Sequence, residues 1–113
     1  MKYGKSLSSD TEPKKTELRF SPAAEKDLLH IALYGMEQFG FEQSELYRDR
    51  LKQRFIELVE SPLMYPAVDQ ISKGYRRSVC GVHSIYYLIY DGDVVIMRVL
   101  GRQNVVEKLP PKH

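Results

Sequence analysis

The sequence contains a single cysteine, Cys80, and this scarcity excludes two kinds of protein. One thiol cannot form an internal disulfide framework or a four-ligand cysteine zinc site, so we expect a protein of a reducing compartment. No apolar run approaches the roughly 18 residues of a membrane-spanning helix. The N-terminus also lacks the apolar segment that is typical of a secretion signal. The sequence therefore favours a cytoplasmic protein that does not enter a membrane.

Charge is nearly balanced overall, at +2, but it is unevenly distributed along the chain. Residues 1–72 contain 10 Lys and Arg against 12 Asp and Glu, whereas residues 73–113 contain 7 against 3. The basic C-terminal part favours an acidic partner, protein or nucleic acid, although an ordinary solvated surface explains so small an excess equally well. The length of 113 residues and the hydrophobic content of 42% predict one globular domain.

The spacing of apolar residues predicts a β-α-α-β-β-β order. Ser21 and Pro22 form a helix start, and Gly40 ends that helix so soon before the next one that the two must be antiparallel. The expected elements are a strand at 16–20, helices at 22–39 and 42–60, and strands at 75–80, 83–90 and 94–100. We expect a flexible tail at 1–15, a domain at 16–109 and a C-terminal tail at 110–113.

Three or four antiparallel strands covered on one face by two helices form the stable arrangement for these elements. The fold class is therefore α+β, with an N-terminal antiparallel helical hairpin on a small antiparallel sheet. Asp91-Gly92 predicts a two-residue turn between the last two strands. This turn places Tyr87 opposite Ile96, and Ile85 opposite Arg98.

Both faces of the strand pair at 83–90 and 94–100 are largely apolar, so both must be covered. The two helices can cover one face, and the other must meet the surroundings of the first strand, a self-contact or a partner. One face carries His83, Tyr87 and Arg98. A charged group needs water or an acceptor, so we expect this face to lie away from the helices and to contact a partner. The alternative is that Arg98 reaches solvent at the rim of the sheet and that His83 is a hydrogen-bonded core imidazole.

Patterns for catalysis are weak. Cys80 and His83 are three residues apart, which on a strand points them to opposite faces. The histidines form no metal-ligand motif, and no phosphate-binding glycine loop is present. General acid–base cleavage of RNA stays open as an alternative. The side chains of suitable type for it are His83, Tyr87, Arg98 and Arg102.

Two stretches together resemble a known family. Residues 18–40, LRFSPAAEKDLLHIALYGMEQFG, resemble the first strand and helix of ParE-type toxins, in the ParE/RelE superfamily of bacterial toxin–antitoxin modules. SPLMYP at 61–66, followed by GYRRSVCGVHSIYYLIYDGDVVIMRVLGR at 74–102, resembles the second half of that family. The resemblance covers about residues 17–109, and the order and spacing of the motifs carry it.

The resemblance implies a type II toxin that poisons DNA gyrase and blocks replication, with no chemistry of its own. RelE-like members of the superfamily instead cut mRNA on the ribosome. Val79 stands where that branch tends to place a catalytic arginine, and no tyrosine follows Arg102. We therefore favour gyrase, with mRNA cleavage and a diverged, non-toxic interaction protein as the alternatives.

The resemblance also implies a ParD-like antitoxin whose disordered part folds onto apolar surface of the toxin. The candidate antitoxin contacts are Leu29, Leu33, Tyr34 and Tyr47. The candidate contacts to the target are Arg98, Arg102, Gln103, His83, Tyr87, Arg76 and Arg77. We expect no catalytic residue, metal, cofactor, membrane contact or sequence-specific binding of nucleic acid, and a location in the bacterial cytoplasm.

Overall fold

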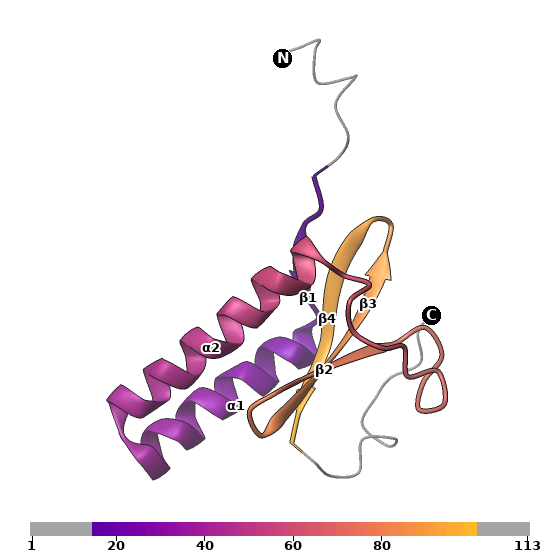
Figure 1. The fold of residues 1–113 in the computed structure, drawn as a ribbon. Helices are drawn as coiled ribbons and strands as arrows, with labels where there is room; N and C mark the ends of the chain where they lie inside the picture. The colour runs from indigo at the N-terminus through magenta and orange to yellow at the C-terminus, as the bar shows by residue number, and fades with distance from the viewer. Residues whose placement is uncertain (1–14, 102–113) are drawn as a thin grey trace.

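The structure, a computed structural model, describes residues 15–101 (Figure 1). Its elements are β1 (Leu18–Phe20), α1 (Pro22–Phe39), α2 (Phe41–Glu60), β2 (Arg76–Cys80), β3 (His83–Tyr90) and β4 (Asp93–Leu100). The predicted α+β class and the order of the elements are confirmed. Almost all of the predicted tail at 1–15, the tail at 110–113, and Arg102 and Gln103 lie outside the described residues.

Residues at the helix ends place the helical hairpin against the sheet. The Ser21 hydroxyl caps α1 by accepting a hydrogen bond from the Ala24 amide at 3.0 Å, and Pro22 occupies the first turn. The same hydroxyl donates to the Met97 carbonyl at 2.8 Å, which fixes the start of α1 to β4. Gly40 has a φ of 88° and separates the two helices, as the sequence predicts.

The strand order is β1-β4-β3-β2, so the first and last strands are neighbours. β3 pairs antiparallel with β2 and β4, whereas β1 runs parallel to β4, with Leu18 opposite Val94. The prediction of a purely antiparallel sheet is therefore corrected at β1. A tight turn can join only antiparallel neighbours, but the long connection through both helices lets β1 and β4 run in the same direction.

The main core lies between the helices and one face of the sheet. Its buried residues are Ala24, Leu51, Phe55, Leu58, Cys80, Ile85, Tyr87, Val94, Ile96 and Val99. The rings of Phe20 and Phe55 meet edge to face in this core, with centroids 5.2 Å apart. The apolar stripes expected on both helices therefore face the sheet where the helices overlie it.

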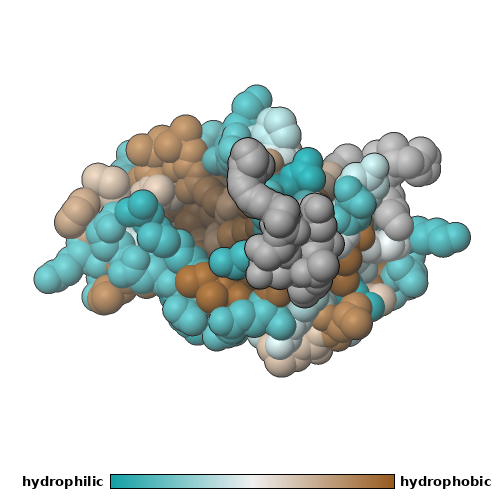
Figure 2. Space-filling view, turned by 90° about the horizontal axis from the view of Figure 1, so that it is seen from above, coloured by the Kyte–Doolittle hydropathy of each residue, from teal (hydrophilic) through white to brown (hydrophobic). Residues whose placement is uncertain are grey.

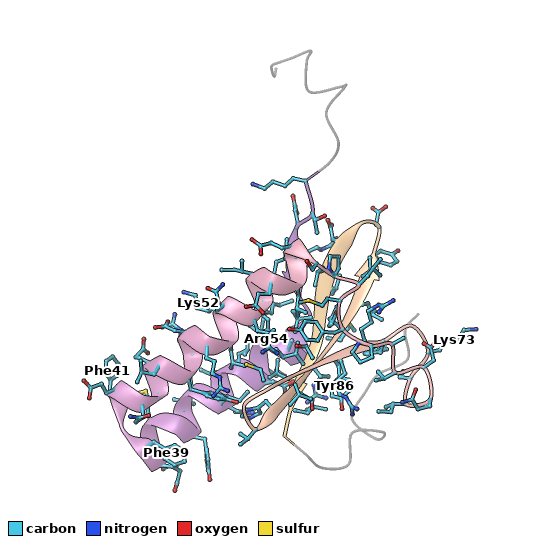
Figure 3. All side chains as sticks on the ribbon, in the orientation of Figure 1. Phe39, Phe41, Lys52, Arg54, Lys73 and Tyr86 are labelled. Atoms are coloured by element: carbon cyan, nitrogen blue, oxygen red, sulfur yellow. The ribbon has the colours of Figure 1, made fainter. Side chains whose placement is uncertain are left out.

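The face that carries His83 and Tyr87 lies under the helices, so the prediction that it faces away from them was wrong. The reason is that Asp27 of α1 supplies an acceptor for Arg98, so the cation on this strand pair does not need water. The opposite face is covered by the connection between α2 and β2, and Figure 3 shows Tyr86 on that side. Residues Val68, Ile71 and Tyr75 of this connection pack with Tyr86, Leu88, Met97 and Leu100.

A β-bulge changes the register of the last two strands. Tyr87 lies opposite Ile96 as predicted, but Ile85 lies opposite Val99 rather than Arg98. One extra residue of β4, between Ile96 and Arg98, causes this shift. Val99 therefore enters the main core, and the Arg98 side chain reaches the flank of α1 instead.

Candidate partner-binding groove

The helical hairpin extends past the sheet (Figure 1). Within α1, which the structure describes in full, Ala24 is the one buried residue. Many large apolar side chains of the hairpin are exposed, and these are Leu29, Leu33, Tyr34, Met36, Phe39, Phe41, Leu46 and Ile56. Apolar surface concentrated in this way is typical of a site that binds another protein.

Part of this surface lines a groove of about 760 Å³. Its apolar walls include Leu28, Ile31, Tyr34 and Phe39 of α1 and Leu51 and Phe55 of α2. Figure 2 shows a hollow with apolar walls on the side of the molecule that the hairpin occupies. The groove has room for several side chains of a partner, and its walls favour apolar ones.

Tyr47 and His83 form a polar pair in the groove. The Tyr47 hydroxyl oxygen lies 2.7 Å from Nδ1 of His83 and 3.1 Å from the Cys80 carbonyl oxygen, to which it can donate. The Val82 amide donates to the same hydroxyl at 3.3 Å. One side chain of α2 thus holds the turn between β2 and β3. Burial raises the pKa of Tyr47 and lowers the pKa of His83, so both favour their neutral forms.

The lowered pKa of His83 predicts a loss of stability in mild acid. The unfolded chain takes up the proton at a pKa of about 6.5, before the folded chain does, so the free energy of unfolding falls as pH drops below that value. We expect the melting temperature of the wild type to fall more steeply between neutral pH and about pH 5 than that of His83→Gln. Identical pH profiles for the wild type and His83→Gln would contradict this assignment.

The predicted antitoxin contacts fall into two groups. Tyr34 and Tyr47 line the groove, whereas Leu29 and Leu33 are exposed on α1 without lining it. His83, which the sequence places among the target contacts, also lines the groove. The structure therefore joins one residue from each predicted set, Tyr47 and His83, in a single hydrogen bond.

The other predicted target contacts do not form one surface. Arg98 makes a two-pronged ion pair with Asp27, with Nε to Oδ2 at 2.7 Å and Nη2 to Oδ1 at 2.9 Å. Tyr87 is fully buried, and its hydroxyl donates to the Pro62 carbonyl at 2.7 Å. Arg76 donates to a backbone carbonyl of the α2–β2 connection at 2.6 Å. These contacts give Arg98, Tyr87 and Arg76 structural roles in the fold.

Arg77, the remaining described target candidate, is partly buried on β2. Its backbone amide donates to the Pro66 carbonyl at 3.2 Å, which ties this edge strand to the α2–β2 connection. Pro66 has no amide to return the bond, so regular pairing does not continue at that position. Arg77 therefore lies at a covered part of the β2 edge.

Two residues that the sequence does not single out organise this region. Asp27 lies three residues after Ala24 and four before Ile31, and a carboxylate in such an apolar stripe signals a buried cation partner. Arg54 of α2 donates to the Ser78 hydroxyl and to the carbonyl of the following residue, both at 2.7 Å. Nothing in the sequence distinguishes Arg54 from the other cations of α2.

Cys80 and His83, considered above as a nucleophile and its base, have other partners. The buried Cys80 thiol donates to the Arg50 carbonyl at 3.9 Å, and His83 is bound to Tyr47. Within residues 15–101, no three His, Cys, Asp or Glu side chains lie together as a possible metal site. In the same part of the chain, no helix has the length and apolar character needed to cross a membrane.

Comparison with known proteins identifies relatives over most of the chain. The family model described as "ParE toxin of type II toxin-antitoxin system, parDE" matches residues 18–106. Toxin ParE1 of Mycobacterium tuberculosis is 29% identical over 89 residues, which cover 78% of this chain and 91% of that protein. Toxin ParE1 of Caulobacter vibrioides is 33% identical over 82 residues, which cover 73% of this chain and 84% of that protein.

Solved structures share the fold. A chain of the "Chromosomal ParDE TA system from P. aeruginosa" superposes with a TM-score of 0.70 at 14% identity, covering 79% of this chain and 98% of that one. A chain of the toxin–antitoxin complex RelBE2 from Mycobacterium tuberculosis superposes with a TM-score of 0.50 at 24% identity, covering 79% and 100%. At these identities the likeness establishes the fold alone.

Proposed function

The chain belongs to the ParE toxin family of type II toxin–antitoxin systems, and from this membership we propose that it poisons DNA gyrase in the bacterial cytoplasm and is neutralised by a ParD-like antitoxin. The family match over residues 18–106 is the observation that carries the proposal. The toxin acts by binding the cleaved-DNA state of gyrase more tightly than its other states, which shifts the enzyme toward that state. The toxin itself performs no chemical step.

The antitoxin binds in the groove of the helical hairpin. Three observations support this location: the apolar walls, the half-exposed side chains around them, and solved relatives that come from a ParDE system and a RelBE2 complex. A segment that folds on binding would lay its apolar side chains against Tyr34 and Phe39. Because His83 lines the same groove, a bound antitoxin covers His83 as well.

The target is contacted by residues outside the groove and the core. Arg102 and Gln103, which follow β4, are the main candidates, with Arg77 as a secondary one. Arg98 and Tyr87 are left out of this surface because the first is paired with Asp27 and the second is buried. An arginine fork suits a carboxylate of gyrase and a phosphate of DNA equally well.

The proposal is tested with purified toxin, gyrase, plasmid DNA and ATP. We expect loss of supercoiling and accumulation of linear, cleaved DNA, and we expect the antitoxin encoded beside the toxin gene to reverse both. Induced expression should arrest bacterial growth, with rescue by the same antitoxin. Growth arrest without any effect on gyrase would contradict the gyrase target and would redirect the search to mRNA cleavage on the ribosome.

Phe39 and Phe41 provide a matched test of the groove. Both side chains are 66% exposed and lie at the tip of the hairpin (Figure 3), but only Phe39 lines the groove. Phe39→Asp should weaken antitoxin binding at least about tenfold, because it places a charge where an apolar side chain would be buried. Titration calorimetry measures the change in affinity.

The control variant, Phe41→Asp, should bind the antitoxin with nearly wild-type affinity. Neither substitution removes a buried group, so both variants should unfold within about 0.5 kcal/mol of the wild type. Equal losses of antitoxin affinity in Phe39→Asp and Phe41→Asp would show that the groove is not the binding site.

Arg102 provides a test of the target surface. Arg102→Ala should weaken toxicity by about tenfold, as expected for the loss of a charge-assisted hydrogen bond to the target. Viable counts after induction measure toxicity, and an unfolding curve checks that the variant is as stable as the wild type. Wild-type toxicity from a well-expressed Arg102→Ala protein would rule out this contact.

A further inference from the structure

The polar pair of Tyr47 and His83 gives the apolar groove a point of chemical recognition. Resting on the antitoxin site proposed above, we infer that His83 donates its Nε2 proton to a carboxylate of the antitoxin segment. Tyr47 is then a positioning residue, because its hydroxyl holds the imidazole in the tautomer that leaves the proton on Nε2. Ligand sites commonly combine apolar walls with a few polar groups that fix the orientation of the bound molecule.

The hydrogen bonds around Tyr47 determine which ring nitrogen of His83 carries the proton. The phenol oxygen accepts from the Val82 amide at 3.3 Å. Its own proton has two acceptors within reach, Nδ1 of His83 at 2.7 Å and the Cys80 carbonyl at 3.1 Å. A distance of 2.7 Å is typical of a bond that a hydroxyl donates and short for one that an N–H donates, so the geometry favours Tyr47 as the donor and Nδ1 as the acceptor. With Nδ1 accepting, the neutral ring carries its proton on Nε2.

The charges around the groove favour a carboxylate as the acceptor. Among the described residues that line it, none is acidic, whereas Lys52, His30 and Arg48 are basic types, of which Arg48 is paired with Glu45 at the surface. Apolar walls of low polarisability strengthen the field of such groups and so favour an anionic occupant. Burial lowers the pKa of His83 and the charge of Asp27 opposes this shift, but the Asp27 carboxylate already forms an ion pair with Arg98. A carboxylate from the antitoxin would therefore meet a donor and a positive potential in the same groove.

Nitrogen NMR of the full-length toxin tests the tautomer without any partner. Slightly above neutral pH, the His83 ring of the wild type should carry its proton on Nε2. In Tyr47→Phe, which keeps the ring of residue 47 but loses the hydroxyl, we expect a mixture of both tautomers. A proton on Nδ1 in the wild type, or an unchanged tautomer in Tyr47→Phe, would overturn the inference.

Two amide variants test the contact in the complex, with the antitoxin encoded beside the toxin gene as the probe. The amide nitrogen of glutamine reaches the position of Nε2, whereas that of asparagine reaches only Nδ1. His83→Asn should therefore bind the antitoxin about ten- to hundredfold more weakly than wild type, and His83→Gln within about threefold. Equal affinities for the two variants would overturn the inference.

The acidic residues of the antitoxin are then replaced by their amides, one at a time. One position should lose affinity for the wild-type toxin and lose little further affinity for His83→Asn, which is the signature of a direct contact. Additive losses at every position would overturn the carboxylate assignment. A wild-type toxin that does not bind the antitoxin at all would instead count against the proposed function.

Discussion

Replacing Arg98 by alanine is expected to lower the free energy of unfolding by about 3 kcal/mol, because the Asp27 carboxylate then stays buried without its cation. The two side chains are 19% and 11% exposed and form two short bonds. Asp27 also accepts the Val99 amide at 2.9 Å, so it cannot turn toward solvent without losing a third bond. Urea unfolding followed by circular dichroism measures the change.

Arg48 provides the control for Arg98. It forms an ion pair with Glu45 at 3.2 Å, and both side chains are exposed, at 58% and 39%. Arg48→Ala should therefore cost less than about 1 kcal/mol. An Arg98→Ala protein as stable as Arg48→Ala would contradict the structural role of Arg98. A loss of toxicity in Arg98→Ala would not by itself identify a target contact, because unfolding alone would cause it.

Replacing Gly81 by alanine is expected to cost about 3 kcal/mol of stability and to release Tyr47 from His83. Gly81 has a φ of 62°, which is unfavourable for a residue with a side chain. The added Cβ would lie 2.6 Å from Cε1 and 2.7 Å from the hydroxyl oxygen of Tyr47. The ring must therefore move away from the turn that it holds. Urea unfolding measures the stability, and the NMR titration of His83 reports whether its pKa returns toward the ordinary value.

Gly92 provides a control with the same backbone requirement but no neighbour. Its φ is 81°, and a Cβ there would meet nothing within 4 Å, so Gly92→Ala should cost only about 1 kcal/mol. In a Tyr47→Ala background, Gly81→Ala should cost a similar small amount, because the clashing ring is gone. A cost for Gly81→Ala that stays the same in that background would contradict the packing explanation.

Local signals in the sequence predicted the elements of this fold well. Ser21, Pro22 and Gly40 mark the ends of α1, and Asp91-Gly92 forms the predicted turn, with a φ of 52° at Asp91. These signals act over a few residues, where backbone preference and capping decide the conformation. The exposure of Tyr34 and Leu33 can likewise be predicted from the helical pattern. An amphipathic helix longer than the sheet beneath it must leave part of its apolar side uncovered.

Features that depend on distant parts of the chain could not be predicted in this way. The bulge between Ile96 and Arg98 has no local marker, and it exchanges the faces of the residues that follow it. The hydrogen bond from Tyr47 to His83 joins residues 36 positions apart, on different elements. From the sequence, Tyr47 was assigned to the antitoxin and His83 to the target. Only the packing of α2 on the β2–β3 turn brings the two side chains together.

The position of β1 beside β4 has a consequence for the synthesis of the toxin. The N-terminus of a protein leaves the ribosome first, so β1 emerges before the strand that it pairs with, β4. Arg19 of β1 and its partner Asp93 of β4, for example, are 74 positions apart in the chain. The hydrogen bonds of Asp27 to Arg98 and of Ser21 to the Met97 carbonyl also cannot form before β4 is present. Contacts of such long range form late in folding. A nascent chain that ends before β4 therefore cannot complete the sheet, so the folded toxin exists only once translation of that strand is finished.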